Sequence, residues 1–120
     1  MKQETGNTNR GERLVHDWIN DPGYPVTIFS RGFCSYCTAV KNLFRQIGVE
    51  FRAIEVDAPE YCDKVLYGEI RECLFLLTGQ ATLPQVFIGS EAVGGYTESY
   101  DLYFRRELQD KLEPLGYGFE

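Results

Sequence analysis

The sequence predicts an α/β fold: a four-stranded mixed sheet flanked by helices, with an additional N-terminal helix. Three observations support this. A strand, a helix and a strand follow one another with short joints in residues 25–56, two short strands flank a tight turn in residues 85–93, and amphipathic helices precede, separate and follow these strands. A length of 120 residues suits one domain.

Residues 1–10 are mostly polar and predict a flexible N-terminal tail, which leaves residues 11–120 as a single domain. Residues 12–20 predict the additional helix, and the Asp-Pro-Gly at 21–23 ends it. Its apolar residues recur on one helical face: Leu14, Val15, Trp18 and Ile19.

Residues 25–30 (PVTIFS) predict the first strand and residues 49–56 (VEFRAIEV) the second. A helix over residues 34–47 joins them, with Gly48 as its C-terminal cap. Strands joined by a short helical crossover are parallel. The buried stripe of this helix is formed by Cys37, Val40, Phe44 and Ile47.

Pro59 suits the first turn of a middle helix that runs to about Thr78, with Gly68 as a candidate break. Residues 85–89 (QVFIG) and 91–93 (EAV) predict an antiparallel hairpin.

Thr97 is the predicted cap of a last helix. This helix and the helix over residues 34–47 cover one face of the sheet, and the middle helix covers the other. Such an arrangement is of the thioredoxin type. The predicted inner face of the last helix consists of Leu102, Leu108, Leu112 and Leu115.

The composition, 43% hydrophobic and 25% charged, is that of a globular chain and excludes a disordered one. The formal charge of −6 argues against a nucleic-acid partner. No apolar run approaches the ~18 residues that span a bilayer. The first 25 residues show no signal-peptide pattern, so we expect a cytoplasmic protein with no membrane partner.

The motif CSYC at residues 34–37 lies where the first strand meets its helix. Unpaired N–H groups and the positive end of the helix dipole converge there, so a thiolate on Cys34 is stabilised. Arg31 adds a positive charge, and we expect Lys41 and Arg45 to make this corner basic. Cys37 lies one turn further, on the buried stripe.

This asymmetry suits thiol–disulfide exchange: an exposed thiolate attacks a disulfide, and a less exposed thiol resolves the mixed disulfide. Two alternatives are a pair of core thiols and a zinc site that adds Cys62 and Cys73. Cys62 and Cys73 lie in the predicted middle helix, about 16 Å apart if that helix is continuous, so they cannot form a disulfide unless Gly68 breaks the helix sharply. His16 is expected to be an ordinary surface or packing residue.

Four segments in this order resemble the glutaredoxin family: PVTIFS (25–30), RGFCSYC (31–37), TLPQVFIG (82–89) and GGYTE (94–98). The resemblance covers residues 25–115. It implies a thioredoxin-like fold and a glutathione-dependent thiol–disulfide oxidoreductase, with Cys34 as the nucleophile and Cys37 as the resolving cysteine. The implied partners are glutathione, as co-substrate, and proteins that carry disulfides or bound glutathione.

The resemblance also implies a glutathione site. Arg31 stands where the family has a lysine for the glycine carboxylate, Leu83–Pro84 is expected to be a cis peptide that presents the Leu83 backbone, and the helix after the double glycine receives the γ-glutamyl carboxylate. The implied glutathione-binding residues are Arg31, Tyr36, Arg71, Thr82, Leu83, Pro84, Thr97 and Glu98.

The sequence departs from the family pattern at three places. Ser35 replaces the proline of the commoner CPYC motif, Glu98 replaces an aspartate, and the segment between Asp57 and Thr78 is a few residues longer than usual. The longer segment affects the alignment of Arg71.

An alternative function follows from Ser35. Some family members without that proline bridge a [2Fe–2S] cluster between two subunits, and Cys34 would then be the metal ligand; otherwise no metal is expected. A reductant recharged by a flavoenzyme and a non-catalytic interaction module are further alternatives. Without a cluster, we expect a monomer.

Overall fold

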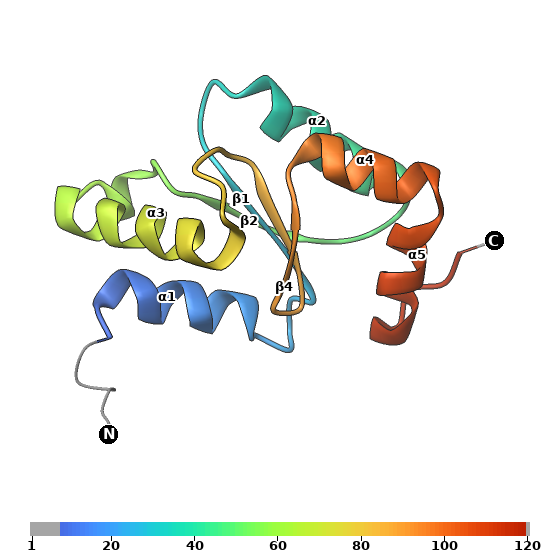
Figure 1. The fold of residues 1–120 in the computed structure, drawn as a ribbon, viewed down its shortest axis with the longest axis horizontal. Helices are drawn as coiled ribbons and strands as arrows, with labels where there is room; N and C mark the ends of the chain where they lie inside the picture. The colour runs from blue at the N-terminus through green and yellow to red at the C-terminus, as the bar shows by residue number, and fades with distance from the viewer. Residues whose placement is uncertain (1–7, 120) are drawn as a thin grey trace.

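The computed structural model describes residues 8–119, and Figure 1 shows a central sheet with helices on both sides. The four strands are ordered β2-β1-β3-β4. β1 pairs with β2 in parallel and with β3 antiparallel, and β3 pairs with β4 antiparallel. This is the predicted thioredoxin-like sheet. The strands are β1 (Val26–Ser30), β2 (Arg52–Glu55), β3 (Gln85–Ile88) and β4 (Glu91–Gly94).

The helices form two layers, one on each face of the sheet (Figure 1). One layer contains α1 (Arg10–Ile19) and α3 (Lys64–Thr78), which lie side by side. The other contains α2 (Ser35–Gln46), α4 (Tyr96–Phe104) and α5 (Glu107–Leu112). Short 3₁₀ turns are η2 (Pro59–Tyr61) and η3 (Glu113–Leu115).

Alternating side chains of β1 divide the core between these two layers. Val26 and Ile28 pack with buried residues of α2 and α5, including Phe44 and Leu108. Phe29 faces the opposite way, into a cluster formed with α1 and α3. Every residue of β1 is buried, so this strand is a fixed base for the loop that follows it.

Gly11 lets α1 approach α3 closely. Its N–H donates to Glu69 Oε1 at 3.0 Å, and a Cβ at this position would lie 2.7 Å from the backbone nitrogen of Ile70. α1 begins at Arg10, within the predicted tail, because the side chain of Asn9 caps it. The remainder of that predicted tail, residues 1–7, lies outside the described residues.

The middle helix begins later than predicted. Pro59 opens the short turn η2 instead, and α3 starts after Asp63, whose Oδ1 accepts the Val65 N–H at 3.0 Å. Gly68 does not break α3. Cys62 therefore precedes the helix that was predicted to contain it.

The last helix differs from the prediction at both ends. Its N-cap is Gly95 and not Thr97. The helix is interrupted at Arg106, which adopts a left-handed conformation (φ 65°). α5 therefore begins as a separate helix after this residue. Leu108 and Leu112 are buried as predicted, but Leu115 is 41% exposed because η3 carries it past the core.

Candidate active site

The candidate active site begins at the N-terminus of α2. Cys34 is the N-cap residue, with an extended backbone (φ −130°), and its Sγ accepts the N–H of Cys37 at 3.2 Å. The first-turn N–H groups of a helix have no intrahelical partner, and the helix dipole is positive at this end. The position therefore stabilises negative charge on the Cys34 sulfur.

Cys34 and Cys37 form a disulfide in this structure, with their Cα atoms 5.2 Å apart. The two side chains differ in access: Cys34 is half-buried, whereas Cys37 is 1% exposed in the core-facing stripe of α2. After reduction, an incoming disulfide reaches Cys34 and not Cys37.

The loop before Cys34 is held by a residue that the sequence analysis missed. The carboxylate of Asp57 accepts the Gly32 N–H at 2.9 Å. Phe33 then takes a left-handed backbone (φ 52°), which is uncommon outside glycine, and its side chain is fully exposed. A signal for Asp57 existed, because the carboxyl ends of parallel β1 and β2 meet at one sheet edge. Arg31, in the same loop, is exposed.

The predicted basic corner is wrong for two of its three residues. Lys41 Nζ pairs with Glu55 Oε2 at 2.7 Å, and Arg45 lies over the Phe51 ring near the far end of α2. Arg31 is the member of the predicted set that lies in the loop preceding Cys34.

The segment before β3 faces the cysteines. Leu83–Pro84 is a cis peptide, as expected, and the Leu83 carbonyl oxygen lies 3.9 Å from Cys34 Sγ. Beside it is a cavity of about 290 Å³ between α2, this segment and the start of α4. Six of the eight implied glutathione residues line it, namely Tyr36, Thr82, Leu83, Pro84, Thr97 and Glu98, together with Gln80, Gly95 and Tyr96.

This packing requires glycine at position 94 and favours it at position 95. Gly94 has φ 105°, and a Cβ there would lie 2.8 Å from the Glu98 side chain. A Cβ on Gly95 would lie 3.2 Å from the Pro84 carbonyl oxygen. Glu98 Oε1 in turn accepts the Gly95 N–H at 2.8 Å, so this carboxylate closes the N-terminus of its own helix.

Arg31 and Arg71 do not line this cavity. Arg71 donates to the Tyr67 hydroxyl and to the Ala81 carbonyl, both at 2.6 Å. It therefore braces the segment that leads to Thr82. Gln80 and Tyr96 also line the cavity, although the sequence analysis did not select them. Tyr96 lies within the GGYTE segment and could have been chosen, whereas no sequence motif pointed to Gln80.

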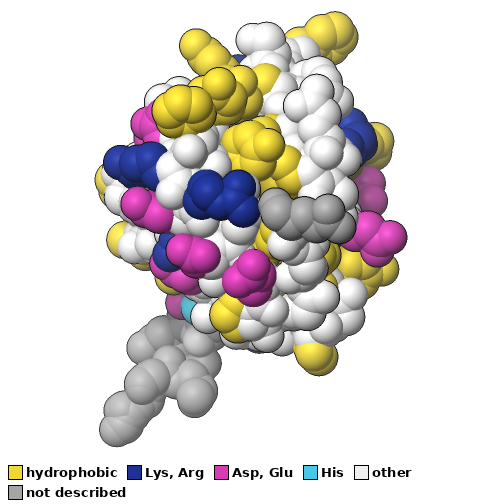
Figure 2. All heavy atoms as spheres, turned by 90° about the vertical axis from the view of Figure 1, so that its right-hand side faces the viewer, with side chains coloured by type: hydrophobic (Ala, Val, Ile, Leu, Met, Phe, Trp, Pro, Cys, Tyr) yellow, Lys and Arg dark blue, Asp and Glu magenta, His cyan; other side chains and the backbone are white. Residues whose placement is uncertain are grey.

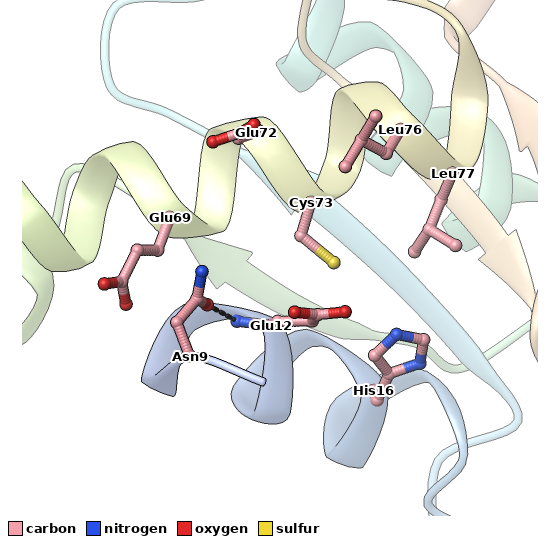
Figure 3. Close-up of a pocket in the computed structure, with 8 residues that line it drawn as sticks. All are labelled: Asn9, Glu12, His16, Glu69, Glu72, Cys73, Leu76 and Leu77. Atoms are coloured by element: carbon pink, nitrogen blue, oxygen red, sulfur yellow. Dashed lines mark hydrogen bonds between the residues drawn. The ribbon is translucent and has the colours of Figure 1, made fainter. Parts of the chain in front are cut away.

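The other two cysteines are unpaired and lie away from this site: Cys62 is exposed and Cys73 is buried. Burial, with a smaller contribution from Glu12, raises the pKa of Cys73 to about 11. Figure 3 shows its sulfur pointing from α3 toward α1, in a second cavity of about 200 Å³. That cavity is lined by Asn9, Glu12, His16, Glu69, Glu72, Cys73, Leu76 and Leu77.

His16 is exposed on α1, at the edge of this second cavity. Within residues 8–119, no group of three or more His, Cys, Asp and Glu side chains is placed to hold a metal ion. The four cysteines therefore do not assemble the zinc site considered from the sequence.

The fold and the paired cysteines define a dithiol protein of the thioredoxin-like class. The family model for glutaredoxin matches residues 26–93. The chain belongs to the glutaredoxin family.

Relatives and solved structures agree with this assignment. The chain is 41% identical over 92 residues to glutaredoxin-C1 of Arabidopsis thaliana, covering 77% of this chain and 66% of that protein. It is 36% identical over 90 residues to mitochondrial glutaredoxin-2 of Bos taurus, covering 75% and 52%. The crystal structure of the buckwheat glutaredoxin–glutathione complex superposes with a TM-score of 0.79 at 28% identity, covering 95% of this chain and 97% of that one.

The chain thus spans between about half and two thirds of the length of these two curated relatives. Among the described residues, no helix is both long and apolar enough to cross a membrane.

Proposed function

We propose that this protein is a glutathione-dependent thiol–disulfide oxidoreductase in which Cys34 is the nucleophile and Cys37 the resolving cysteine. The observation that carries the proposal is the position of Cys34 Sγ, which accepts the Cys37 N–H at a helix N-terminus beside the cavity. The buckwheat relative, crystallised with glutathione, supports glutathione as the co-substrate.

With a protein–glutathione mixed disulfide, the Cys34 thiolate attacks the glutathione sulfur. A bond forms between Cys34 and glutathione, the old disulfide breaks, and the protein leaves as a thiolate that takes a proton from water. The thiolate of a second glutathione then attacks the bound glutathione sulfur. Oxidised glutathione leaves and the Cys34 thiolate is regenerated.

With a protein disulfide, Cys34 first forms a mixed disulfide with one substrate sulfur. The Cys37 thiol gives its proton to the substrate thiolate freed in that first step and attacks Cys34 Sγ. The bond between Cys34 and the substrate breaks, the second substrate sulfur leaves as a thiolate that takes a proton from water, and the Cys34–Cys37 disulfide of this structure remains. Two glutathiones return the pair to dithiols and leave as oxidised glutathione. The Cα separation of 5.2 Å lets this step occur without unfolding α2.

The cavity suits a peptide with a carboxylate at each end. The first-turn N–H groups of α4 and the Thr97 hydroxyl are donors for the γ-glutamyl carboxylate. Arg31 is exposed in the loop that precedes α2, outside the residues that line the cavity, and is the partner for a glycine carboxylate that reaches out of it. The backbone of Leu83 pairs with the glutathione cysteine as a short strand. Glu98 is engaged with Gly95, so its contact with the glutathione ammonium is made from a carboxylate that also caps α4.

Arg71 acts on this site indirectly, by bracing Ala81 next to Thr82. The proposal further places the protein in the cytoplasm, in electron transfer from glutathione that maintains cell redox homeostasis. Its partners are glutathionylated and disulfide-bearing proteins, with no nucleic-acid or membrane partner, and it acts as a monomer. Residues 11–120 form its single catalytic domain.

The test is glutathione-driven turnover of a glutathionylated peptide by the reduced, metal-free protein and by its Cys34→Ser and Cys37→Ser variants. We expect turnover by the parent protein and by Cys37→Ser, and none by Cys34→Ser. Absence of turnover by the parent protein contradicts the proposal. Visible absorbance of iron-loaded, glutathione-containing protein together with that absence would favour the bridged [2Fe–2S] dimer, with Cys34 as ligand.

A further inference from the structure

Gln85 is a buried polar residue beside the proposed glutathione site that takes no part in the exchange steps. It is the first residue of β3 and is 1% exposed, which is unusual for a glutamine. Its side-chain Nε2 donates to the carbonyl oxygen of Thr82 at 2.8 Å, and Thr82 lines the cavity. The side chain therefore reaches back past Leu83 and Pro84 to hold one wall of the cavity.

Gln85 holds this wall from the inner side. Side chains alternate along β3, so Gln85 points to the same face of the sheet as Phe87, which packs in the cluster formed with α1 and α3. The cavity lies on the other side of the wall, between α2, the segment before β3 and the start of α4, and Gln85 does not line it. The side chain can therefore act on a ligand only through the backbone that it holds.

The bond from Gln85 fixes the direction of a backbone donor. The peptide bond between Thr82 and Leu83 is trans, unlike the one that follows it. In a trans peptide the carbonyl and the N–H lie in one plane and point in opposite directions. Because Gln85 holds the Thr82 carbonyl on the inner side, the Leu83 N–H of the same peptide points away from Gln85, toward the cavity that Leu83 lines.

The neighbouring carbonyls are also fixed. Arg71 Nη2 donates to the carbonyl oxygen of Ala81 at 2.6 Å. The Leu83 carbonyl oxygen, one residue beyond the one that Gln85 holds, lies 3.9 Å from Cys34 Sγ. Two successive peptide planes are thus tied to protein side chains, and the third faces the nucleophile.

Core packing alone does not account for a glutamine at this position. Its Oε1 is buried and has no hydrogen-bond partner among the described residues. A buried oxygen without a partner costs stability, and an apolar side chain of similar volume avoids that cost. What the glutamine supplies in exchange is the single bond from its amide nitrogen to the segment that lines the cavity.

We infer that Gln85 is a positioning residue for glutathione. Its amide fixes the peptide between Thr82 and Leu83 so that the Leu83 N–H is presented to the backbone of the glutathione cysteine. This inference rests on the proposed function, in which the Leu83 backbone pairs with glutathione. It assigns Gln85 to the affinity for glutathione-bearing substrates and not to the reactivity of Cys34.

The test compares two variants of Gln85 with one matched control. Gln85→Met keeps the length of the side chain and removes the donor, whereas Gln85→Asn keeps an amide that is one methylene too short to reach the Thr82 carbonyl. The control is Gln109→Met. Gln109 is also buried with an unpartnered Oε1, but it belongs to α5, on the side of the molecule that Figure 2 shows, and α5 contributes no residue to the cavity.

Three quantities are measured for each protein. They are kcat and KM for a glutathionylated peptide at a fixed glutathione concentration, the midpoint of urea unfolding, and the rate at which iodoacetamide alkylates Cys34 when Cys37→Ser is also present. We expect both Gln85 variants to raise KM about tenfold and to leave kcat within about threefold. Alkylation of Cys34 should stay within about twofold of the parent rate, because α2 and the Cys37 N–H are unchanged.

Stability should not follow KM. Gln85→Met loses one hydrogen bond together with one unpartnered oxygen, so its urea midpoint should stay near that of the parent protein. Gln85→Asn loses the same bond, keeps a buried oxygen and leaves a small void, so its midpoint should be lower. An equal rise in KM in two variants of different stability separates positioning from packing. Gln109→Met should keep the KM of the parent protein.

A KM within twofold of the parent value in Gln85→Met overturns the inference, whatever happens to stability. So does an equal rise in Gln109→Met, since KM would then respond to the loss of any buried amide. A fall in Cys34 alkylation that matches the fall in kcat/KM also overturns it, because Gln85 would then act on the nucleophile. Failure of the proposed function looks different: the parent protein itself would not turn over the glutathionylated peptide.

Discussion

The two helix layers hold cysteines in opposite environments. On the α2 side, Cys34 begins a helix, is half-buried, and accepts a backbone N–H. On the α3 side, Cys73 lies in the middle of a helix, where the surrounding backbone N–H groups already bond within the helix, and its pKa is raised to about 11 by burial and by Glu12. The same residue is placed for nucleophilic chemistry in one layer and for packing in the other.

The comparison shows that position along a helix determines what a thiol can do. A helix start supplies unpaired donors and a positive dipole, and it follows a loop that leaves the sulfur accessible. A helix interior supplies neither. A cavity alone does not confer reactivity, since Cys73 also borders one (Figure 3).

The largest expected effect separates these two cysteines directly. Cys34→Ser removes the proposed nucleophile and should lower glutathione-driven turnover by about 1,000-fold or more. Cys73→Ser, the matched control, should retain turnover within about twofold of the parent protein. Steady-state kinetics on a glutathionylated peptide measures both. Comparable losses of turnover in the two variants would show that Cys34 and Cys73 do not differ in their importance for the reaction.

Thiol reactivity sharpens the same comparison. In the oxidised protein Cys34 and Cys37 are joined, which leaves Cys62 and Cys73 to react. With a pKa of about 11, Cys73 is about 0.1% thiolate at pH 8, so iodoacetamide should modify it at least about 100-fold more slowly than exposed Cys62.

The rate at which iodoacetamide modifies Cys73 should rise with pH. Raising the pH increases the Cys73 thiolate fraction about tenfold per unit until it levels off near pH 11. Peptide mapping by mass spectrometry follows the two sites separately, and unfolded protein provides the reference rate. Equal modification of both cysteines in the folded protein at pH 8 would contradict the assigned environment of Cys73.

Gly11→Ala tests the close packing of α1 against α3. The added methyl group would clash with the α3 backbone at Ile70, so α1 must shift, and we expect the free energy of unfolding to fall by about 1–3 kcal/mol. Turnover per folded molecule should not change, because α1 contributes no residue to the cavity between α2, the segment before β3 and the start of α4. Urea unfolding measures stability, with Gly68→Ala as control, since a Cβ at Gly68 meets open space. Equal stabilities of the two variants would show that the close approach of α1 and α3 is unimportant.

Arg31→Ala should give the smallest of these effects. Loss of the proposed charge-assisted contact to the glycine carboxylate should raise the KM for glutathione about tenfold and leave kcat within about threefold. Arg31→Lys keeps the charge and should recover most of the affinity. A lower kcat with an unchanged KM would contradict this role and would indicate that Arg31 positions the loop that contains Gly32 and Phe33.

The sequence was sufficient for the sheet and for the position of the cysteine pair. Strand patterns around the buried β1 and the short crossover through α2 are local signals, and they predicted the parallel pairing correctly. The last helix was harder. A proline or glycine marks a break in sequence, whereas the left-handed Arg106 that separates α4 from α5 is not a glycine and gave no such mark.

The site was predicted less completely, because side-chain partners come from tertiary structure. Lys41 was counted as part of a basic corner, but β2 brings Glu55 to it. Glu98 was assigned to the ligand, yet it also accepts the Gly95 N–H, and there is room for its side chain only because Gly94 has no Cβ. Asp57 was missed because its partner, the Gly32 N–H, is 25 residues away in the chain, and the only signal for the pair was that the carboxyl ends of β1 and β2 meet at one sheet edge.

The central claim is that glutathione, and not the substrate protein, is transferred to Cys34. Its most direct test is the intact mass of reduced Cys37→Ser after reaction with a glutathionylated peptide in the absence of free glutathione, followed by mapping of the modified cysteine. The account predicts a glutathione adduct on Cys34. An adduct of the peptide itself on Cys34, or a glutathione adduct on Cys62 or Cys73, would contradict it.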